Sequence, residues 1–271
     1  MHYIVSKLNQ ITTLAMNNRT LRLLKYMLIV SPAFVLFSFI RPVKNITIYL
    51  AGDSTAADKE VRYYPETGWG MPFKVFFDHT VTVKNIAKNG RSTQSFINEG
   101  LWKSITDQLA ADDYVLIQFG HNDEVPTKKT YTTETQFAAN LTRFVADVRA
   151  KGAIPLLLTP VARRKFDQTG KVEGTHEIYS AIVRRVAGEM RVPLLDLDRD
   201  SQLLLQKMGP ENSRLLYNHL GVGEHPNYPL GKADDTHFNE LGARMMAQIV
   251  LSEIRLLKLD LADRVVQPAT P

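Results

Sequence analysis

Four polar stretches of the chain carry side chains of the types that can hydrolyse an ester. Such a reaction needs a nucleophile, a base that takes its proton, a group that orients the base, and donors that stabilise the developing oxyanion. The candidates are Ser54, Gly90, Asn122, Asp234 and His237. Each of them alone is more typical of a turn or a helix cap, so the prediction rests on their combination.

The nucleophile and its base lie far apart in the sequence. Ser54 follows an apolar run and supplies the hydroxyl, and His237 is the expected base. Asp234 lies three residues before His237, so a turn would place its carboxylate beside the imidazole. The neighbouring Asp235 is expected to point away or to cap that turn through backbone N–H groups.

The expected oxyanion donors are two backbone N–H groups and one side-chain amide. The backbone groups belong to Ser54 and Gly90, and Gly90 lacks a Cβ, which lets a substrate approach its backbone closely. Asn122 can donate through its amide without carrying a charge. These three residues would therefore have to meet at one place in the fold.

Segments with the apolar pattern of buried strands precede Ser54, Gly90 and Asn122. The predicted strands are 46–50, 81–86, 114–119, 154–158 and 193–197. The predicted helices are a short one around 75–77 and longer ones at 94–102, 133–151, 175–191 and 240–257, the last with Asn239 as N-cap. Strands that alternate with helices indicate an α/β fold with parallel βαβ units, and such sheets bind ligands at the carboxyl ends of their strands. The polar segment 159–174 is expected at the rim of that site.

Composition and charge limit the classes of function. The chain is 44% hydrophobic and 23% charged, as globular proteins are, and no repeat or linker divides its 271 residues. The net charge of +5 comes from residues 1–41, which leaves 28 basic against 28 acidic residues in the remainder. A balanced body with no long basic run does not indicate a nucleic-acid partner. The absence of cysteine excludes disulfides and a thiol nucleophile.

An apolar leader precedes the predicted domain. Residues 26–40 carry no charge and are flanked by Arg22, Lys25 and Arg41, as in a signal peptide. The segment is short for a membrane span and contains Pro32, yet no clear cleavage site follows it. A cleaved signal peptide and an uncleaved signal anchor both remain open, with a buried helix as a third reading.

The leader divides the chain into a signal or anchor segment, 1–41, and a domain, 42–271. Either form of the leader predicts export to a periplasmic or extracellular location, and the anchor form adds attachment to a membrane. Met16 would give a tighter signal sequence than Met1, so we expect translation to begin at Met16.

The polar stretches resemble the four motif blocks of the SGNH (GDSL) hydrolases. The matching residues are Gly52-Asp53-Ser54, Gly90, Gly120-His121-Asn122-Asp123 and Asp234-x-x-His237. The resemblance runs from about residue 46 to 257. It implies a flavodoxin-like three-layer α/β/α sandwich with a five-stranded parallel sheet, a Ser-His-Asp triad at its carboxyl edge, and no metal or organic cofactor.

Within that superfamily the chain is similar to the rhamnogalacturonan acetylesterase branch. The similarity lies in Gly68-Trp69-Gly70, residues 90–96 and residues 223–229 ahead of 235–238. It implies a carbohydrate acetylesterase that acts on acetylated pectic polysaccharides or oligosaccharides through an acetyl-enzyme. Trp69 and His225 are then expected to bind substrate.

Other readings remain open. The same scaffold could serve a lysophospholipase or thioesterase that acts on longer acyl esters, or a non-catalytic glycan-binding protein. A zinc site of His219, His225 and His237 lacks the ligand spacing typical of such sites. The basic triplet 163–165 either favours an acidic substrate or is a solvated loop.

Overall fold

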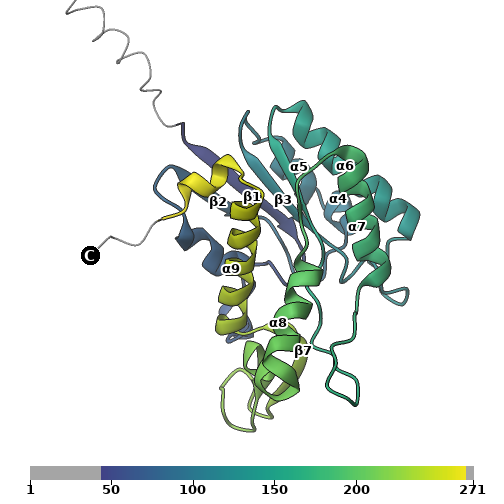
Figure 1. Ribbon diagram of the computed structural model, residues 1–271, viewed down its shortest axis with the longest axis vertical. Coiled ribbons are helices and arrows are strands. Elements are labelled where there is room, and N and C mark those ends of the chain that lie inside the picture. Colours follow the sequence, from purple (N-terminus) through teal and green to yellow (C-terminus); the bar gives the residue numbers. More distant parts are fainter. Residues whose placement is uncertain (1–43, 267–271) are drawn as a thin grey trace, which may run out of the picture. The chain divides into compact units, whose positions relative to one another are not determined.

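Five parallel strands form the central sheet in the order β2-β1-β3-β4-β5 (Figure 1). The computed structural model describes residues 44–266, so the apolar leader lies outside the described residues. The strands are β1 (Ile46–Gly52), β2 (Val81–Asn85), β3 (Tyr114–Gln118), β4 (Ile154–Leu158) and β5 (Leu194–Leu195). This is the flavodoxin-like strand order, and it confirms the expected five-stranded parallel α/β sheet.

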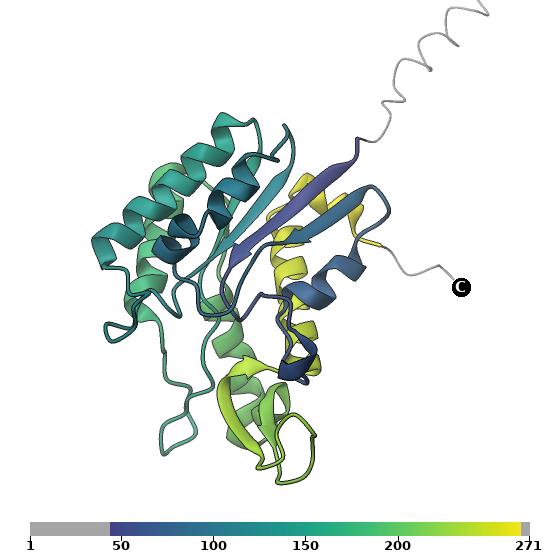
Figure 2. The same cartoon turned by 180° about the vertical axis from the view of Figure 1, so that it is seen from behind.

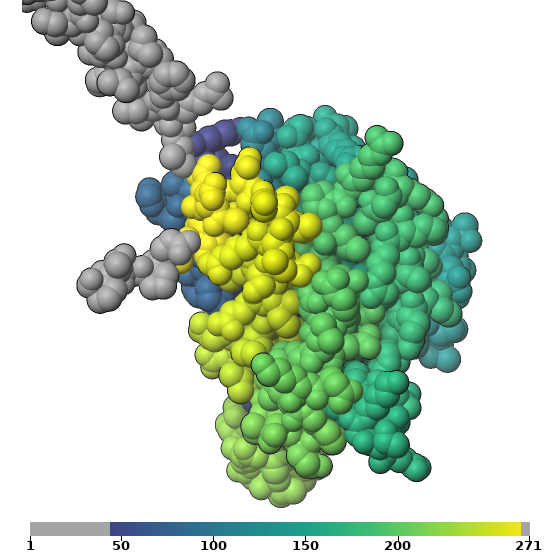
Figure 3. Space-filling view, viewed as in Figure 1, coloured from purple at the N-terminus to yellow at the C-terminus, as the bar shows by residue number. Residues whose placement is uncertain are grey.

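Helices cover both faces of the sheet because its strands are apolar on both sides. Along β1, Ile46, Ile48 and Leu50 enter one core and Tyr49 and Ala51 the other. The first face is covered by α3 (Gly70–Phe73), α8 (Leu197–Asn212) and α9 (Glu240–Leu256) (Figures 1 and 3). The second is covered by α4 (Thr93–Asn98), α5 (Leu101–Thr106), α6 (Glu134–Ala150) and α7 (Glu177–Met190) (Figure 2).

Three element boundaries differ from the expectation. The helix expected at 94–102 is two helices, because Gly100 adopts φ 74° between α4 and α5. The strand expected at 193–197 is shorter, because β5 has only two residues, and the helix α8, which was not predicted, follows it. The short helix expected near residue 75 begins earlier, as α3 and the 3₁₀ turn η2 (Lys74–Phe76). Further 3₁₀ turns are η1 (Val61–Tyr63), η3 (Ser213–Leu216) and η4 (Asp260–Arg264).

An antiparallel hairpin outside the sheet carries His237. Its strands are β6 (Tyr217–Leu220) and β7 (Lys232–Phe238), which the sequence did not predict. Asn239 caps α9 as expected, since its Oδ1 accepts the Gly242 N–H at 3.0 Å. The amide of Asn239 also donates to the carbonyls of Leu215 and Tyr217, which ties the start of α9 to the hairpin. The start of α9 therefore fixes the position of β7.

No helix among residues 44–266 is both long and apolar enough to cross a membrane.

Candidate active site

The candidate residues meet at the carboxyl edge of the sheet. Ser54 follows β1, Gly90 lies beyond β2, and Asn122 lies beyond β3. Strands β1 and β3 are neighbours, and the chain runs from the end of β1 towards β2 on one side and from the end of β3 towards β4 on the other. This is the switch point at which parallel α/β sheets form a crevice.

Ser54, His237 and Asp234 form a continuous hydrogen-bonded chain. The Nε2 atom of His237 lies 3.0 Å from the Oγ of Ser54. The Nδ1 atom of the same ring lies 2.9 Å from the Oδ2 of Asp234. A ring whose Nδ1–H is held by a carboxylate presents an unprotonated Nε2, which is the form that can accept the serine proton.

A bulge in β7 makes the contact between Asp234 and His237 possible. Residues three apart on a regular strand point to opposite faces of the sheet. Here Tyr217 pairs with Phe238 while Asn218 pairs with Asp234, so residues 235–237 have no partners on β6. The Oδ1 of Asp234 accepts the backbone N–H groups of Thr236 and His237 at 2.8 and 2.9 Å. The expected turn therefore exists, and it lies within strand β7.

Asp234 is held in its ionised form. Its half-buried position would by itself raise the pKa of this carboxyl group. The hydrogen bond and charge of His237 and the two backbone N–H groups more than offset burial, so the pKa lies well below its usual range. The Nζ of Lys232 lies 3.2 Å from the same Oδ2 and adds a further positive charge.

Two backbone N–H groups at the site are free to bind an oxyanion. No atom of the described residues accepts a hydrogen bond from the N–H of Ser54 or of Gly90. Gly90 has φ 76°, and a Cβ built there would contact nothing within 4 Å, because it would point into open space. The glycine is thus needed for its backbone conformation as well as for close approach of a substrate.

Asn122 is oriented from both ends of its amide. Its Oδ1 accepts a hydrogen bond from the Lys128 ammonium at 2.9 Å, and its Nδ2 donates a hydrogen bond to the carbonyl of Arg91 at 3.1 Å. The second N–H of the amide has no acceptor among the described residues, and the side chain lines the same cavity as Ser54. An amide fixed in this way is a preorganised donor.

The cavity above Ser54 is small and polar, with a volume of about 340 Å³. Its wall includes two cations, Lys128 and Arg163. Arg163 donates to Thr236 at 2.8 Å and lies 3.4 Å from Glu124. Lys128 is exposed and makes no ion pair with a carboxylate of the described residues.

Trp69 does not have the place expected of it, whereas Asp235 has one of the two that were expected. Trp69 is 1% exposed and its indole N–H donates to the buried Gln118 at 2.5 Å, so it packs in the core and cannot contact substrate. Asp235 does point away from His237. It does not cap the turn, however, because its carboxylate pairs with Arg164 and with His219, each at 2.8 Å.

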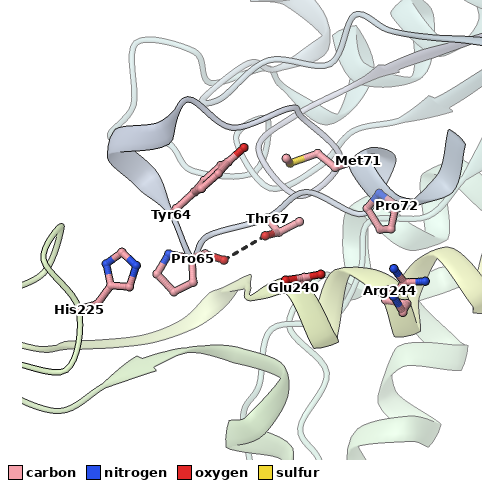
Figure 4. A pocket seen from close by; sticks show the side chains of 8 residues that line it. All are labelled: Tyr64, Pro65, Thr67, Met71, Pro72, His225, Glu240 and Arg244. Carbon is pink, nitrogen blue, oxygen red and sulfur yellow. Dashed lines mark hydrogen bonds between the residues drawn. The ribbon is translucent and has the colours of Figure 1, made fainter. Parts of the chain in front are cut away.

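His225 lines a separate groove of about 420 Å³ (Figure 4). Tyr64, Pro65 and Thr67 form one side of this groove, and α9 contributes Glu240 and Arg244 (Figure 4). Tyr63 and Glu66, from the same segment as Tyr64, line the catalytic cavity instead. The segment 63–67 is therefore the wall between groove and cavity.

The sequence interpretation missed three charged residues next to the triad. They are Lys59, Glu66 and Lys232. Ligand atoms of Glu66, Asp234 and His237 lie within 4.8 Å of one another, as in a metal site, but the ammonium of Lys232 is 3.2 Å from both carboxylates. A lysine thus supplies the positive charge there. No local pattern marks these residues, because the contacts of Lys232 with Glu66 and of Lys59 with Asn89 join parts of the chain that are distant in sequence.

Comparisons with known proteins identify the family and relatives of this chain. Residues 50–245 match the GDSL-like lipase/acylhydrolase family. The chain is 43% identical over 224 residues to the rhamnogalacturonan acetylesterase RhgT of Bacillus subtilis (strain 168), which covers 82% of this chain and 95% of that protein. It is 34% identical over 226 residues to the probable rhamnogalacturonan acetylesterase YesY of the same organism, with coverage of 81% and 97%.

Solved structures share the fold. The crystal structure of the Bacillus subtilis protein YxiM has a TM-score of 0.69 at 29% identity, and the match covers 81% of this chain and 59% of that longer one. The acetylxylan esterase Axe2 of Geobacillus stearothermophilus has a TM-score of 0.55 at 16% identity, with coverage of 78% and 94%, and supports the fold alone. The family match spans most of the described chain and includes every residue of the hydrogen-bonded triad. The chain therefore belongs to the GDSL-like lipase/acylhydrolase family.

Proposed function

We propose that this protein is a serine esterase that removes acetyl groups from a pectic polysaccharide of the rhamnogalacturonan type. The observation that carries the proposal is the chain of hydrogen bonds from Ser54 through His237 to Asp234, which opens on a small polar cavity. The relatives named above as rhamnogalacturonan acetylesterases support the choice of acetyl ester and polymer.

Acylation begins with attack of the Ser54 Oγ on the acetyl carbonyl carbon. His237 takes the hydroxyl proton on Nε2 as the new C–O bond forms, and Asp234 stabilises the resulting imidazolium. The negative charge on the carbonyl oxygen is stabilised by the N–H groups of Ser54 and Gly90 and by the amide of Asn122. The imidazolium then returns the proton to the sugar oxygen as the tetrahedral intermediate collapses, which releases the deacetylated sugar.

Deacylation repeats these steps with water as the nucleophile. His237 removes a proton from the water as it attacks the acetyl-enzyme, and the same donors stabilise the second oxyanion. Acetate leaves and Ser54 regains its proton. The residues of the site account for every proton transfer without a cofactor.

The charges of the cavity favour an acidic polymer. Lys128 is exposed at the cavity and makes no ion pair with a carboxylate of the described residues, so a uronate carboxylate could pair with it. The one carboxylate in the wall, Glu66, is already paired with Lys59 and Lys232 and adds little repulsion. A neutral polymer such as xylan would leave Lys128 without such a partner.

The proposal is tested by acetate release from a matched panel of substrates. Acetylated rhamnogalacturonan should be hydrolysed with a higher kcat/KM than acetylated xylan or acetylated monosaccharides. Acyl esters of two carbons should be preferred over esters of eight or more. Release from xylan without release from pectic substrates would refute the choice of polymer, and preference for long acyl chains would instead indicate a lipid or thioester substrate.

We also propose that the protein is exported, with the polymer as an extracellular substrate. The basic and apolar character of residues 1–41 supports this proposal. Fractionation of the native host should place the protein outside the cytoplasm, and N-terminal peptide mapping should show whether the leader is cleaved or retained as an anchor. Recovery of peptides from residues 1–15 would contradict a start at Met16.

A further inference from the structure

A buried lysine joins the nucleophile to the rest of the site. The side chain of Lys59 is fully buried, and its Nζ donates to the Ser54 carbonyl at 2.6 Å. The same ammonium donates to the Oδ1 of Asn89 at 2.7 Å and lies 2.7 Å from the Oε1 of Glu66. All three partners are acceptors, so the three N–H groups of the charged form are fully used.

Each partner of Lys59 belongs to a different part of the site. Ser54 follows β1 and carries the attacking hydroxyl. Asn89 directly precedes Gly90, which lines the cavity and is the expected oxyanion donor. Glu66 belongs to the wall segment 63–67. One ammonium therefore fixes the relative positions of the nucleophile, the oxyanion loop and the cavity wall.

The charged contacts continue to the triad carboxylate. The Oε2 of Glu66 lies 3.2 Å from the Nζ of Lys232, and that Nζ lies 3.2 Å from the Oδ2 of Asp234. The side chains of Lys59 and Glu66 are 0% and 6% exposed, so water screens this pair little. Charges alternate along the series of Lys59, Glu66, Lys232 and Asp234, which links the loop after β1 to the hairpin strand β7.

Burying these charges is costly unless the arrangement provides something in return. Removing an ammonium or a carboxylate from water carries a large desolvation penalty, and well-packed apolar residues often stabilise a fold equally well. Stability of the fold alone therefore does not require a charged residue at position 59. Its partners are instead the backbone of the nucleophile and the residue beside an oxyanion donor, where small displacements strongly affect rate.

We propose that Lys59, together with Glu66 and Lys232, is a positioning unit that holds Ser54, the Gly90 loop and Asp234 in the geometry that the reaction needs. The inference rests on the esterase function proposed above. It assigns these residues no proton transfer and no contact with the reacting atoms. Their effect should appear in kcat, since the oxyanion exists only in the transition state and its intermediates.

The test uses Lys59→Met, which keeps the length of the side chain and removes its charge. We expect kcat on an acetyl ester to fall by about 10²-fold, as displacement of catalytic groups by about 1 Å does elsewhere, with little change in KM. Lys103→Met is the matched control, because Lys103 is 75% exposed and, within residues 44–266, forms an ion pair only with Asp107, one helical turn away. The control should retain wild-type kcat.

A second variant covers the case in which Lys59→Met does not fold. Asn89→Ala removes the link between Lys59 and the Gly90 loop but leaves every charge in place. It should fold with a Tm near the wild-type value and still lower kcat. If the role of Lys59 were purely structural, Lys59→Met would have a lowered Tm, and its folded fraction would have the wild-type kcat.

Labelling with a fluorophosphonate separates failure of this inference from failure of the proposed function. Wild type should label on Ser54, and Asn89→Ala and Lys59→Met should label more slowly while remaining folded by circular dichroism. If wild type labels and both folded variants label and turn over at the wild-type rate, the positioning role is refuted. If wild type neither labels on Ser54 nor releases acetate, the proposed function fails, and the positioning role fails with it.

Discussion

Replacing one or the other of two adjacent carboxylates, Asp234 and Asp235, tests how the site fixes its base. In Asp234→Asn, the amide oxygen can still accept the backbone N–H groups of Thr236 and His237, so the turn should persist. The group that replaces Oδ2, however, becomes a donor facing Nδ1 and the ammonium of Lys232. The imidazole would then carry its proton on Nε2, where it cannot accept the proton of Ser54.

The expected loss follows from that change of tautomer. Where a triad aspartate is replaced by asparagine with the geometry intact, kcat falls by about 10⁴-fold, which is about 5 kcal/mol of transition-state stabilisation. The substitution also removes the contact between Asp234 and the Lys232 ammonium, because an amide nitrogen cannot accept a hydrogen bond from an ammonium. Loss of this contact adds to the loss of kcat. Thermal unfolding should show that the variant remains folded.

Asp235→Asn is the matched control one residue away. Its carboxylate is 47% exposed and pairs with Arg164 and His219 rather than with His237. The partner side chains are only 14% and 13% exposed, but Arg164 keeps its hydrogen bonds to the Asp235 carbonyl and to Ser213. This variant should therefore lose about 1 kcal/mol of stability and retain kcat near the wild-type value. Initial rates on an acetyl ester and thermal unfolding of both purified variants provide the comparison. Inactivity of Asp235→Asn with near-normal Asp234→Asn would refute the assignment of the orienting carboxylate.

Further substitutions test the oxyanion hole, the groove and the buried acid next to the site. Asn122→Ala should lower kcat by about 10²- to 10³-fold with the fold intact, as loss of one oxyanion donor does elsewhere, and an unchanged kcat would exclude Asn122 from the hole. Tyr64→Ala should raise KM for the polymer but not for a small acetyl ester, because Tyr64 lines the groove of His225 and not the catalytic cavity; equal effects on both substrates would argue against binding of the chain in the groove. Burial raises the pKa of Asp123 to about 7, although hydrogen bonds from Thr93 oppose the shift. The folded protein therefore binds a proton that the unfolded chain has released between about pH 4 and 7, and the free energy of unfolding should fall as pH rises through that window, by up to about 1.4 kcal/mol per pH unit from this group. Urea unfolding at several pH values gives the free energy of unfolding of wild type and of Asp123→Asn, and its slope against pH should be shallower in the variant. Identical slopes against pH would show that Asp123 is ionised throughout.

The sequence predicted those features that depend on local pattern. Apolar runs that end in polar residues marked β1 and β3, and the spacing of Asp234 and His237 predicted a contact that the structure contains. The hairpin of β6 and β7 escaped prediction because β7 is largely polar and bulged, which removes the alternation that identifies strands.

Features that depend on distant partners could not be read from the sequence. Trp69 lies between two glycines, which does not reveal that Gln118 accepts its indole N–H inside the core. Lys59 and Glu66 look like ordinary surface charges, yet the fold buries them as an ion pair and places Lys59 against Ser54 and Asn89. Such pairings are determined by which strand ends meet at the edge of the sheet, and a single sequence records that meeting only indirectly.

Trapping the covalent intermediate would show whether Ser54 is acetylated during turnover. The protein would be mixed with an activated acetyl ester, quenched in acid during turnover and digested for peptide mass spectrometry. We expect an acetyl group on Ser54 in wild type and none in Ser54→Ala. The kcat of that variant should be lower by a factor on the order of 10⁶. An acetyl group on another residue, or near-normal turnover by Ser54→Ala, would contradict the proposed mechanism.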